Sequence, residues 1–186
     1  MTWLLTVLSM LLIGGHMEYK QIHWMGQSAF RIEDSTLQIY IGPFRLPENL
    51  PKADIIFITH AHFDHYSMED IAKIKTGHTV IVAPKDVALK IGGSVTVVVP
   101  GKTYTIGKWK VTTVPAYNLD KRFHPKDNNW VGYNITLSSG LKIYHAGDTD
   151  FLPEMRGIQT DIALLPCGGT YTMTADQAAE MLFPCS

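Results

Sequence analysis

This chain of 186 residues has few cysteines and almost no net charge. Its two cysteines, Cys167 and Cys185, lack Cys-x-x-Cys spacing, so the sequence predicts neither a disulfide framework nor a zinc knuckle. The chain has sixteen Lys and Arg residues and seventeen Asp and Glu residues, which gives a formal net charge of −1. This balance argues against nucleic acid or an anionic membrane as a partner. Sparing use of cysteine fits a reducing compartment, and we expect a cytoplasmic protein.

A hydrophobic run long enough to cross a bilayer is also missing. The most apolar stretch, Trp3–Ile13, is too short to span a membrane comfortably. It has the length of a signal peptide, but no Lys or Arg precedes it, and Gly14-Gly15-His16-Met17 resembles the junction of an added sequence. We therefore expect residues 1–16 to be an N-terminal extension or tag and residues 17–186 to form one domain. The sequence predicts no membrane partner and does not specify an oligomeric state.

Short extended runs separated by glycine and proline dominate the rest of the chain. Helices are predicted after Ser67, near 85–91 and after Thr174, where Ser-x-x-acid and Thr-x-x-Gln capping patterns occur. The runs that we interpret as strands are 21–24, 29–33, 36–41, 55–58, 79–83, 95–99, 103–106, 108–114, 130–137, 141–145 and 161–165. Strands first, then interspersed helices, then strands and a helix again predict a layered α/β sandwich.

Three imidazoles and one carboxylate occupy six consecutive residues, His60-Ala61-His62-Phe63-Asp64-His65. Neutral imidazole and carboxylate suit zinc and its first-row neighbours. The run follows a predicted buried strand, and sites in α/β proteins collect at the carboxyl ends of strands. The alternative is a solvated histidine-rich loop. The density of the cluster favours a metal site, with His60, His62, Asp64 and His65 as candidate ligands.

A second candidate segment is Tyr144-His145-Ala146-Gly147-Asp148-Thr149-Asp150, which a predicted strand delivers. Gly147 would allow backbone to approach a ligand closely. Taken alone, the segment is a turn that closes a strand. Beside the histidine cluster, we interpret Asp148 as a metal carboxylate that could bridge two ions.

The stretch between these segments offers further polar groups. His124 could be another nitrogen ligand, a hydrogen-bond donor to substrate or a plain loop histidine, and Asn118 a weaker oxygen ligand or a turn residue. Lys121, Arg122 and Lys126 could meet an anionic group such as phosphate, although such runs are more often solvated faces. We expect a small anionic substrate.

These motifs together resemble the metallo-β-lactamase superfamily. The run from His60 to His65 matches its H-x-H-x-D-H motif, and Gly147-Asp148-Thr149 matches its later bridging aspartate. Gly26-Gln27-Ser28-Ala29-Phe30 and Leu165-Pro166-Cys167-Gly168-Gly169 are similar to one branch of that superfamily. The branch holds uncharacterised metal-dependent hydrolases and the ascorbate-6-phosphate lactonases. The resemblance covers roughly residues 18–183.

The resemblance implies a four-layer αββα sandwich with two metals at one edge of its sheets. It implies that His60 and His62 hold the first ion, that Asp64 and His65 hold the second, and that Asp148 bridges them.

The chain departs from the family pattern at three places. Asn118 stands where the family has a ligand histidine, which makes His124 the candidate substitute. The early strand ends in Gly42-Pro43 rather than Asp-Pro. The family's final histidine, after the last helix, is not reached before Ser186, so we expect the domain to lack its C-terminal end.

The function that we predict is hydrolysis of an ester, lactone or phosphoester bond by a metal-bound hydroxide. Asp64 would orient the nucleophile and accept its proton, and His124 would orient the substrate. The expected cofactor is zinc, as one or two ions, with manganese, iron or nickel as alternatives.

Three competing hypotheses remain open. One is a nuclease of the same fold, which would need a basic track for nucleic acid. The second is redox chemistry at a di-iron site, and the third is a metal-binding or scaffold protein without catalysis. The candidate track comprises Lys102, Lys108, Lys110, Lys121, Arg122, Lys126 and Lys142.

Overall fold

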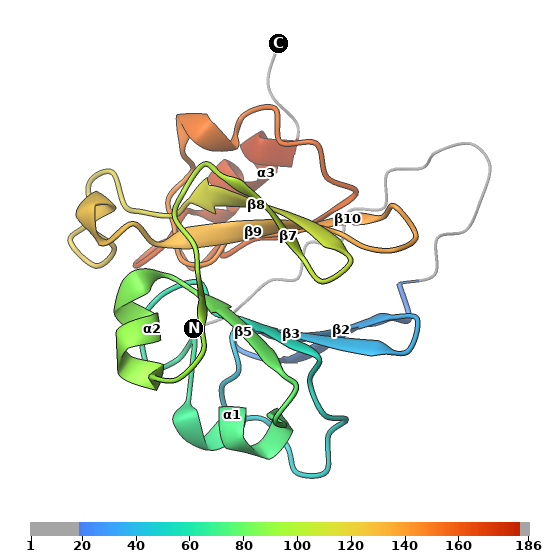
Figure 1. Cartoon of the computed structure of the whole chain (residues 1–186). Helices are drawn as coiled ribbons and strands as arrows, with labels where there is room; N and C mark the ends of the chain where they lie inside the picture. The colour runs from blue at the N-terminus through green and yellow to red at the C-terminus, as the bar shows by residue number, and fades with distance from the viewer. Residues whose placement is uncertain (1–18, 183–186) are drawn as a thin grey trace.

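Two β-sheets stacked face to face form the centre of the molecule in a computed structural model, which describes residues 19–182 (Figure 1). The first sheet has the strand order β1-β2-β3-β4-β5-β6, and the second has the order β11-β10-β9-β8-β7. The strands of the first sheet are β1 (Ile22–Gly26), β2 (Ala29–Asp34), β3 (Leu37–Ile41), β4 (Ile55–Phe57), β5 (Val80–Ala83) and β6 (Thr96–Val97). Those of the second are β7 (Thr103–Ile106), β8 (Trp109–Pro115), β9 (Val131–Thr136), β10 (Lys142–His145) and β11 (Ile162–Leu164). The expected extension, the final residue Ser186 and Cys185 lie outside the described residues.

Strand direction divides each sheet into two parts. β1, β2 and β3 pair antiparallel, whereas β3, β4, β5 and β6 run parallel, with helices in the crossovers after β4 and β5. In the second sheet only β10 and β11 are parallel. Parallel neighbours need a long crossover connection, which is why helices follow the buried strands and not the hairpins.

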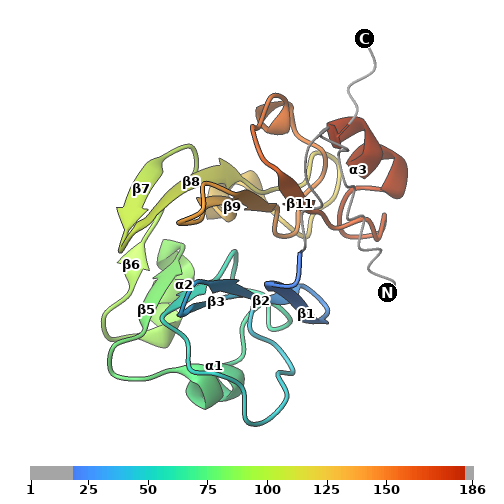
Figure 2. The ribbon, with the colours of Figure 1, turned by 90° about the vertical axis from the view of Figure 1, so that its right-hand side faces the viewer.

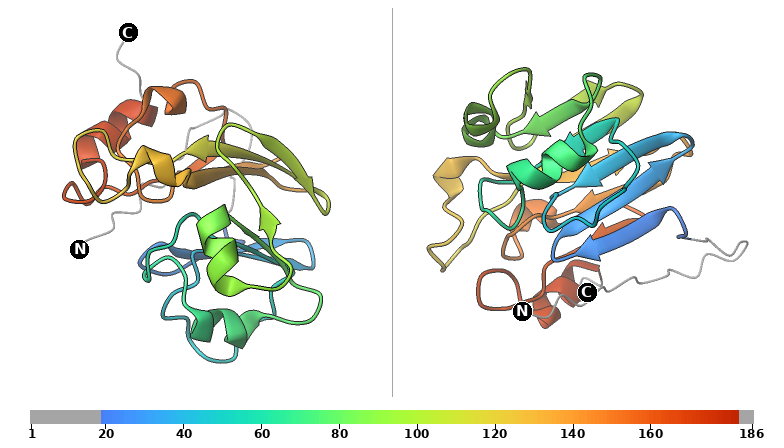
Figure 3. Two further views of the ribbon diagram at one scale, coloured as in Figure 1. Left: turned by 60° about the vertical axis from the view of Figure 1, so that its left-hand side comes forward. Right: turned by 90° about the horizontal axis from the view of Figure 1, so that it is seen from below.

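Helices cover the outer faces of the sandwich. α1 (Met68–Ile74) and α2 (Lys85–Ile91) lie against the first sheet, and α3 (Ala175–Leu182) lies beside the second, near β11 (Figures 2 and 3). Two short 3₁₀ turns, η1 (Lys126–Asn128) and η2 (Pro153–Met155), lie in the loops of the second half. The predicted αββα sandwich is therefore confirmed.

Three separate apolar clusters correspond to the three interfaces between these four layers. Phe57, Tyr133 and Ile143 belong to the cluster between the sheets. Ile56 and Ile58 point the other way, into a cluster with the α1 and α2 side chains. A third cluster, which includes Ala178 of α3, covers the outer face of the second sheet. Because neighbouring side chains on a strand face opposite sides, the continuous apolar run of β4 fills two of these cores.

Capping residues set the helix starts that the sequence predicts. The Ser67 hydroxyl accepts the Asp70 backbone N–H at 3.2 Å, and Thr174 and Gln177 exchange reciprocal hydrogen bonds at the start of α3. The helix over 85–91 has the predicted ends, and the strands differ from their predicted ranges by at most two residues at either end. Among residues 19–182, no helix combines the length and the apolar character needed to cross a membrane.

Candidate metal centre

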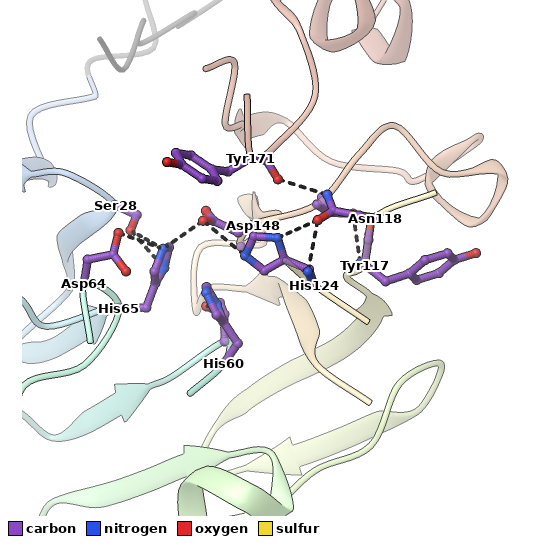
Figure 4. A network of polar contacts seen from close by, with 12 residues as sticks. Ser28, His60, Asp64, His65, Tyr117, Asn118, His124, Asp148 and Tyr171 are labelled. Atoms are coloured by element: carbon purple, nitrogen blue, oxygen red, sulfur yellow. Dashed lines mark hydrogen bonds and ion pairs between the residues drawn. The ribbon is translucent and has the colours of Figure 1, made fainter. Parts of the chain in front are cut away.

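Three strand ends meet at one edge of the sandwich and supply the predicted site residues. The chain leaves β4 at Phe57 and reaches His60 three residues later. β10 ends at His145, just before Asp148, and β8 ends at Pro115, before the loop that contains His124. The histidine run and the later aspartate, more than 80 residues apart in sequence, are therefore neighbours in space (Figure 4).

The structure brings the site residues together in two overlapping groups. His60, His62 and His124 form one group, and His60, His65 and Asp148 form the other. Within each group the potential ligand atoms all lie within 4.8 Å of one another. All of these side chains except that of His62 are buried. Of the alternatives for His124, its place in the first group favours a nitrogen ligand.

Buried polar atoms without hydrogen-bond partners test whether these residues fit a cation. His60 Nε2, His124 Nε2 and Asp148 Oδ1 are buried and lack a partner in the described part of the chain. Leaving such atoms unsatisfied costs free energy, and a native structure normally provides each one with a partner. Imidazole nitrogen and carboxylate oxygen are zinc donors, so a divalent cation among them would satisfy all three. The residues present therefore fit a metal ion.

Asn118 fixes the orientation of His124. Its Oδ1 accepts the His124 backbone N–H at 3.0 Å and lies 2.9 Å from the ring nitrogen Nδ1. With Nδ1 as the donor, Nε2 keeps its lone pair free for a cation. Asn118 Nδ2 in turn donates to the Tyr171 carbonyl at 2.9 Å. Asn118 thus acts through His124 as a supporting residue, and its oxygen is already engaged.

Asp64 lies at the margin of the cluster, outside both groups. Its Oδ2 accepts a hydrogen bond from Gln27 Nε2 at 3.0 Å and is 4.0 Å from His65 Nε2. Gln27 adopts a left-handed conformation with φ 51° in the tight turn between β1 and β2. The next residue, Ser28, places its Oγ 3.0 Å from His65 Nδ1. One turn therefore supports two of the predicted site residues.

Opposite charges determine the ionisation of the inner residues. Burial raises the pKa of Asp148, but the charge of His65 and the nearby His124 ring, whose Nε2 lies 3.5 Å from Asp148 Oδ2, outweigh it and hold the pKa well below its usual 3.8. Burial lowers the pKa of His65, and the Asp148 carboxylate 3.2 Å away more than reverses this, so that it is raised. Burial, followed by the His65 charge, lowers the pKa of His60 well below 6.5. A neutral His60 keeps the lone pair that metal ligation requires.

Two glycines allow the close backbone approaches at this edge. Gly147, which precedes Asp148, has φ +67°, and a Cβ there would lie 3.0 Å from the Thr59 side chain. A Cβ on Gly132 of β9 would lie 2.7 Å from the Ala146 carbonyl oxygen. The backbone contact at Gly132 excludes a Cβ, and at Gly147 a tight contact combines with a positive φ that favours glycine. The close neighbour at Gly147 is the Thr59 side chain, and the expected approach of backbone to a ligand there stays a prediction.

Trp130 is the supporting residue that the sequence analysis missed. The centroid of its ring lies 5.0 Å from that of His60, 4.9 Å from that of His62 and 5.8 Å from that of His124. Its indole N–H donates to Asp86 Oδ2 at 2.9 Å, which ties it to α2. Trp130 therefore contacts every member of the first group. The only sequence signal is an aromatic residue just before a strand, and this is common in protein cores.

Most of the basic residues expected to meet an anion are already paired. Lys121 forms an ion pair with Asp150. Lys126 Nζ lies 3.7 Å from Glu154 Oε1 and 3.3 Å from the Tyr117 hydroxyl. Within the described residues, Arg122 is the remaining member of this trio and is exposed. Positive charge near the site is therefore lower than the sequence alone suggests.

Comparison with known proteins places this geometry among metal-dependent enzymes. The family model described as a beta-lactamase superfamily domain matches residues 21–183. A protein of Thermoplasma acidophilum, named a UPF0173 metal-dependent hydrolase, is 36% identical over 180 residues, which cover 88% of this chain and 78% of that protein. A protein of Thermococcus onnurineus with the same description is 37% identical over 179 residues, 86% of this chain and 77% of that protein.

Two solved structures share the fold. One, from Parabacteroides distasonis and described as a metal-dependent hydrolase, has a TM-score of 0.81 and 34% identity, covering 86% of this chain and 75% of that one. The other is Igni18, a metallo hydrolase of the archaeon Ignicoccus hospitalis. Its TM-score is 0.69 at 26% identity, and the match covers 86% of this chain and 76% of that one.

Proposed function

Because the chain belongs to the β-lactamase superfamily, among its UPF0173 metal-dependent hydrolases, we propose that the two residue groups would hold one or two divalent cations and that the protein hydrolyses an ester, lactone or phosphoester bond. The observation that carries the proposal is the convergence of three unpartnered buried atoms, His60 Nε2, His124 Nε2 and Asp148 Oδ1. A lone buried histidine is ordinary, but three such atoms in adjoining groups need a common partner.

In this proposal the ligand set divides between two places. His60, His62 and His124 hold the first cation, and His65 and Asp148 hold the second. Zinc is our first choice, because imidazole-rich sets with carboxylate suit it, and manganese, iron and nickel are the other candidates. When bound, such cations lower the pKa of a water molecule to about 7 and stabilise negative charge on a carbonyl or phosphoryl oxygen.

Residues of the chain supply proton transfer and orientation. Asp64 is the proposed proton acceptor, because it borders His65 and its side chain remains about one-fifth exposed to solvent. Gln27 donates a hydrogen bond to Asp64 Oδ2, so Asp64 Oδ1 is the oxygen that would take the proton. Asp148 stays ionised at neutral pH and keeps His65 in place.

Elemental analysis and a hydrolysis screen together test the proposal. We expect the purified protein to contain about one or two metal ions per chain and to cleave at least one of an ester, a lactone or a phosphodiester. His62→Ala should lose metal and reduce turnover by more than about 100-fold. His78→Ala is the matched control, because His78 is an exposed histidine in the turn after α1. Full turnover of metal-free His62→Ala would refute the scheme.

A further inference from the structure

Exposed aromatic side chains gather in the segments that carry the site residues. Phe63 lies within the histidine run and is 76% exposed. Phe123 directly precedes His124 and is 38% exposed, and Tyr171 is 39% exposed. Exposed apolar residues are ordinary when scattered singly, but a group of them around a site indicates a binding surface. Phe63 and Phe123 therefore adjoin candidate ligands in the sequence, and Figure 4 draws the Tyr171 ring beside the network that contains Asp148 and His124.

A second ring holds each of these side chains in place. Phe63 packs edge-on against Phe44 with ring centroids 5.8 Å apart, and Phe123 packs edge-on against Tyr171 at 4.7 Å. Edge-to-face contacts favour one arrangement of each pair. A ligand that binds rings already held in place loses less conformational entropy on binding. We refer to Phe44, Phe63, Phe123 and Tyr171 as the aromatic rim.

Main-chain contacts connect the rim to the metal-site residues. The Tyr171 carbonyl accepts the hydrogen bond from Asn118, which in turn holds His124. In Figure 4 the Tyr171 ring extends from this carbonyl toward the end of the network that contains Asp148 and Ser28. One pair of rings therefore belongs to the loops around the histidine run, and the other to the loops that position His124.

Among the described residues, most basic side chains near the rim are already engaged, whereas Arg122, which precedes Phe123, is exposed. Lys121 and Lys126 are paired with Asp150 and Glu154. On the other side, the Arg45 guanidinium carbon lies 5.0 Å from the centroid of the Phe44 ring, so this side chain lies over an aromatic face. A phosphate would need several convergent, unpaired donors. The two ring pairs, Phe44 with Phe63 and Phe123 with Tyr171, have exposed apolar surface in common.

We propose that the aromatic rim binds an apolar acyl chain, so that the substrate is an uncharged ester or lactone of a medium-chain aliphatic or aromatic acid. This inference rests on the proposed hydrolysis and narrows the candidate bonds to esters and lactones, without phosphoesters. The reaction consumes one water and breaks the acyl C–O bond, which releases a carboxylic acid and an alcohol from an ester and a single hydroxy acid from a lactone. Phe63 and Tyr171 would determine acyl-chain specificity without contributing to the chemical step.

Chain-length dependence tests the proposal on the metal-loaded protein. We expect kcat/KM to rise about tenfold from p-nitrophenyl acetate to the octanoate, because added methylenes bind apolar surface. Phe63→Ala and Tyr171→Ala should remove most of this preference, so that the ratio of kcat/KM for the octanoate to kcat/KM for the acetate falls toward one. Leu89→Ala is the control: Leu89 is also 76% exposed but lies on α2. A flat dependence in the wild type, or a preference unchanged in both rim variants, would overturn the inference.

Calorimetric binding separates this inference from the proposed function. Octanoate should bind the metal-loaded protein about tenfold more tightly than acetate, because both carry the same carboxylate and only the chain differs. Inorganic phosphate should bind no better than acetate. If no ester or lactone is cleaved but octanoate binding depends on Phe63, the hydrolysis proposal fails and the apolar site stands. If phosphate binds more tightly than octanoate, the acyl-chain site is wrong.

Discussion

At the level of single residues, the candidate ligands are held by side chains that are not ligands themselves. Thr59 Oγ1 lies 2.9 Å from His60 Nδ1, and Ser28 Oγ lies 3.0 Å from His65 Nδ1. Such partners fix the tautomer and the ring direction of a metal-binding histidine, and they influence affinity almost as strongly as the ligands. The selectivity of this centre should therefore depend on residues outside the histidine run.

Asn118 offers the sharpest test of this view. Asn118→Ala removes the acceptor for His124 Nδ1–H, and we expect zinc affinity to fall by about 10–100-fold. Competition with a chromophoric chelator measures the affinity, and circular dichroism verifies the fold. Asn118→Asp keeps an acceptor oxygen and should recover most of the loss. Unchanged affinity in Asn118→Ala would show that His124 is not a ligand.

At the level of elements, local signals predicted where most helices and strands lie. Lys85–Ile91 and Thr103–Ile106 have the predicted ends, because capping, punctuation and alternation act over a few residues. β6 is only Thr96–Val97, shorter than the predicted range 95–99, because it pairs with the last two residues of β5 alone. The family resemblance supplied the four layers, but the order of the strands within each sheet was not predicted, since strand pairing is not a local property.

The site was predictable where its residues are contiguous in sequence. The run from His60 to His65 carries its own signal, and Asp148 was predicted from its segment beside that run and from the family resemblance. The hydrogen bond between Ser28 and His65 joins residues 37 apart, and Trp130 reaches the site histidines only through tertiary ring contacts. No local pattern distinguishes such a serine or tryptophan from an ordinary core residue. Asp64, at the margin of the cluster, remains a predicted ligand or proton acceptor that the proposed experiments can test.

A buried carboxylate joins turns of the two sheets at the opposite end of β2. Asp34 Oδ2 accepts Trp109 Nε1–H at 2.6 Å and the Ser138 hydroxyl at 2.7 Å. We expect Asp34→Ala to lower the free energy of unfolding by about 2–4 kcal/mol, because it leaves the buried Trp109 N–H without its acceptor and removes the bond to Ser138. Asp34 ends the strand that Ser28 precedes, roughly 15–20 Å away by strand rise, so zinc affinity should stay within about twofold.

Denaturant unfolding and chelator competition measure these two quantities separately. Ser139→Ala, in the exposed part of the same turn, should change stability by less than about 0.5 kcal/mol. A large loss of metal affinity in Asp34→Ala, with the fold intact, would show that the hydrogen bonds of Asp34 are not independent of the metal centre.

At the level of the whole molecule, a few buried hydrogen bonds join the two sheets. Tyr133 of β9 donates its hydroxyl to the Ile58 carbonyl at 2.8 Å. His145 of β10 places Nε2 3.1 Å from the Ser28 carbonyl, and its Nδ1 accepts the Gly147 N–H at 3.1 Å. These contacts require neutral His145, with the proton on Nε2. Protonation of Nδ1 would set two N–H groups against each other and weaken the connection between the sheets.

The stability of the metal-free protein should therefore fall on acidification. Burial lowers the pKa of His145 from 6.5 to about 4. In the unfolded chain an exposed imidazole titrates near about 6.5, so between these pH values the unfolded state binds more protons. The His145 contribution is complete above about pH 6.5 and is lost as the pH falls toward 4, at a cost of about 3 kcal/mol. His60 and His62, whose pKa values are also lowered, add to the same trend.

Unfolding in denaturant at pH 7, 5.5 and 4, with chelator present, isolates the His145 contribution. His145→Gln keeps a donor for the Ser28 carbonyl but has no proton to take up, so its stability should fall by about 3 kcal/mol less than that of the wild type over this range. His78→Ala, which changes an exposed histidine, should keep the full dependence on pH. An equal loss of stability on acidification in His145→Gln and in the wild type would mean that protonation of His145 does not weaken the connection between the sheets.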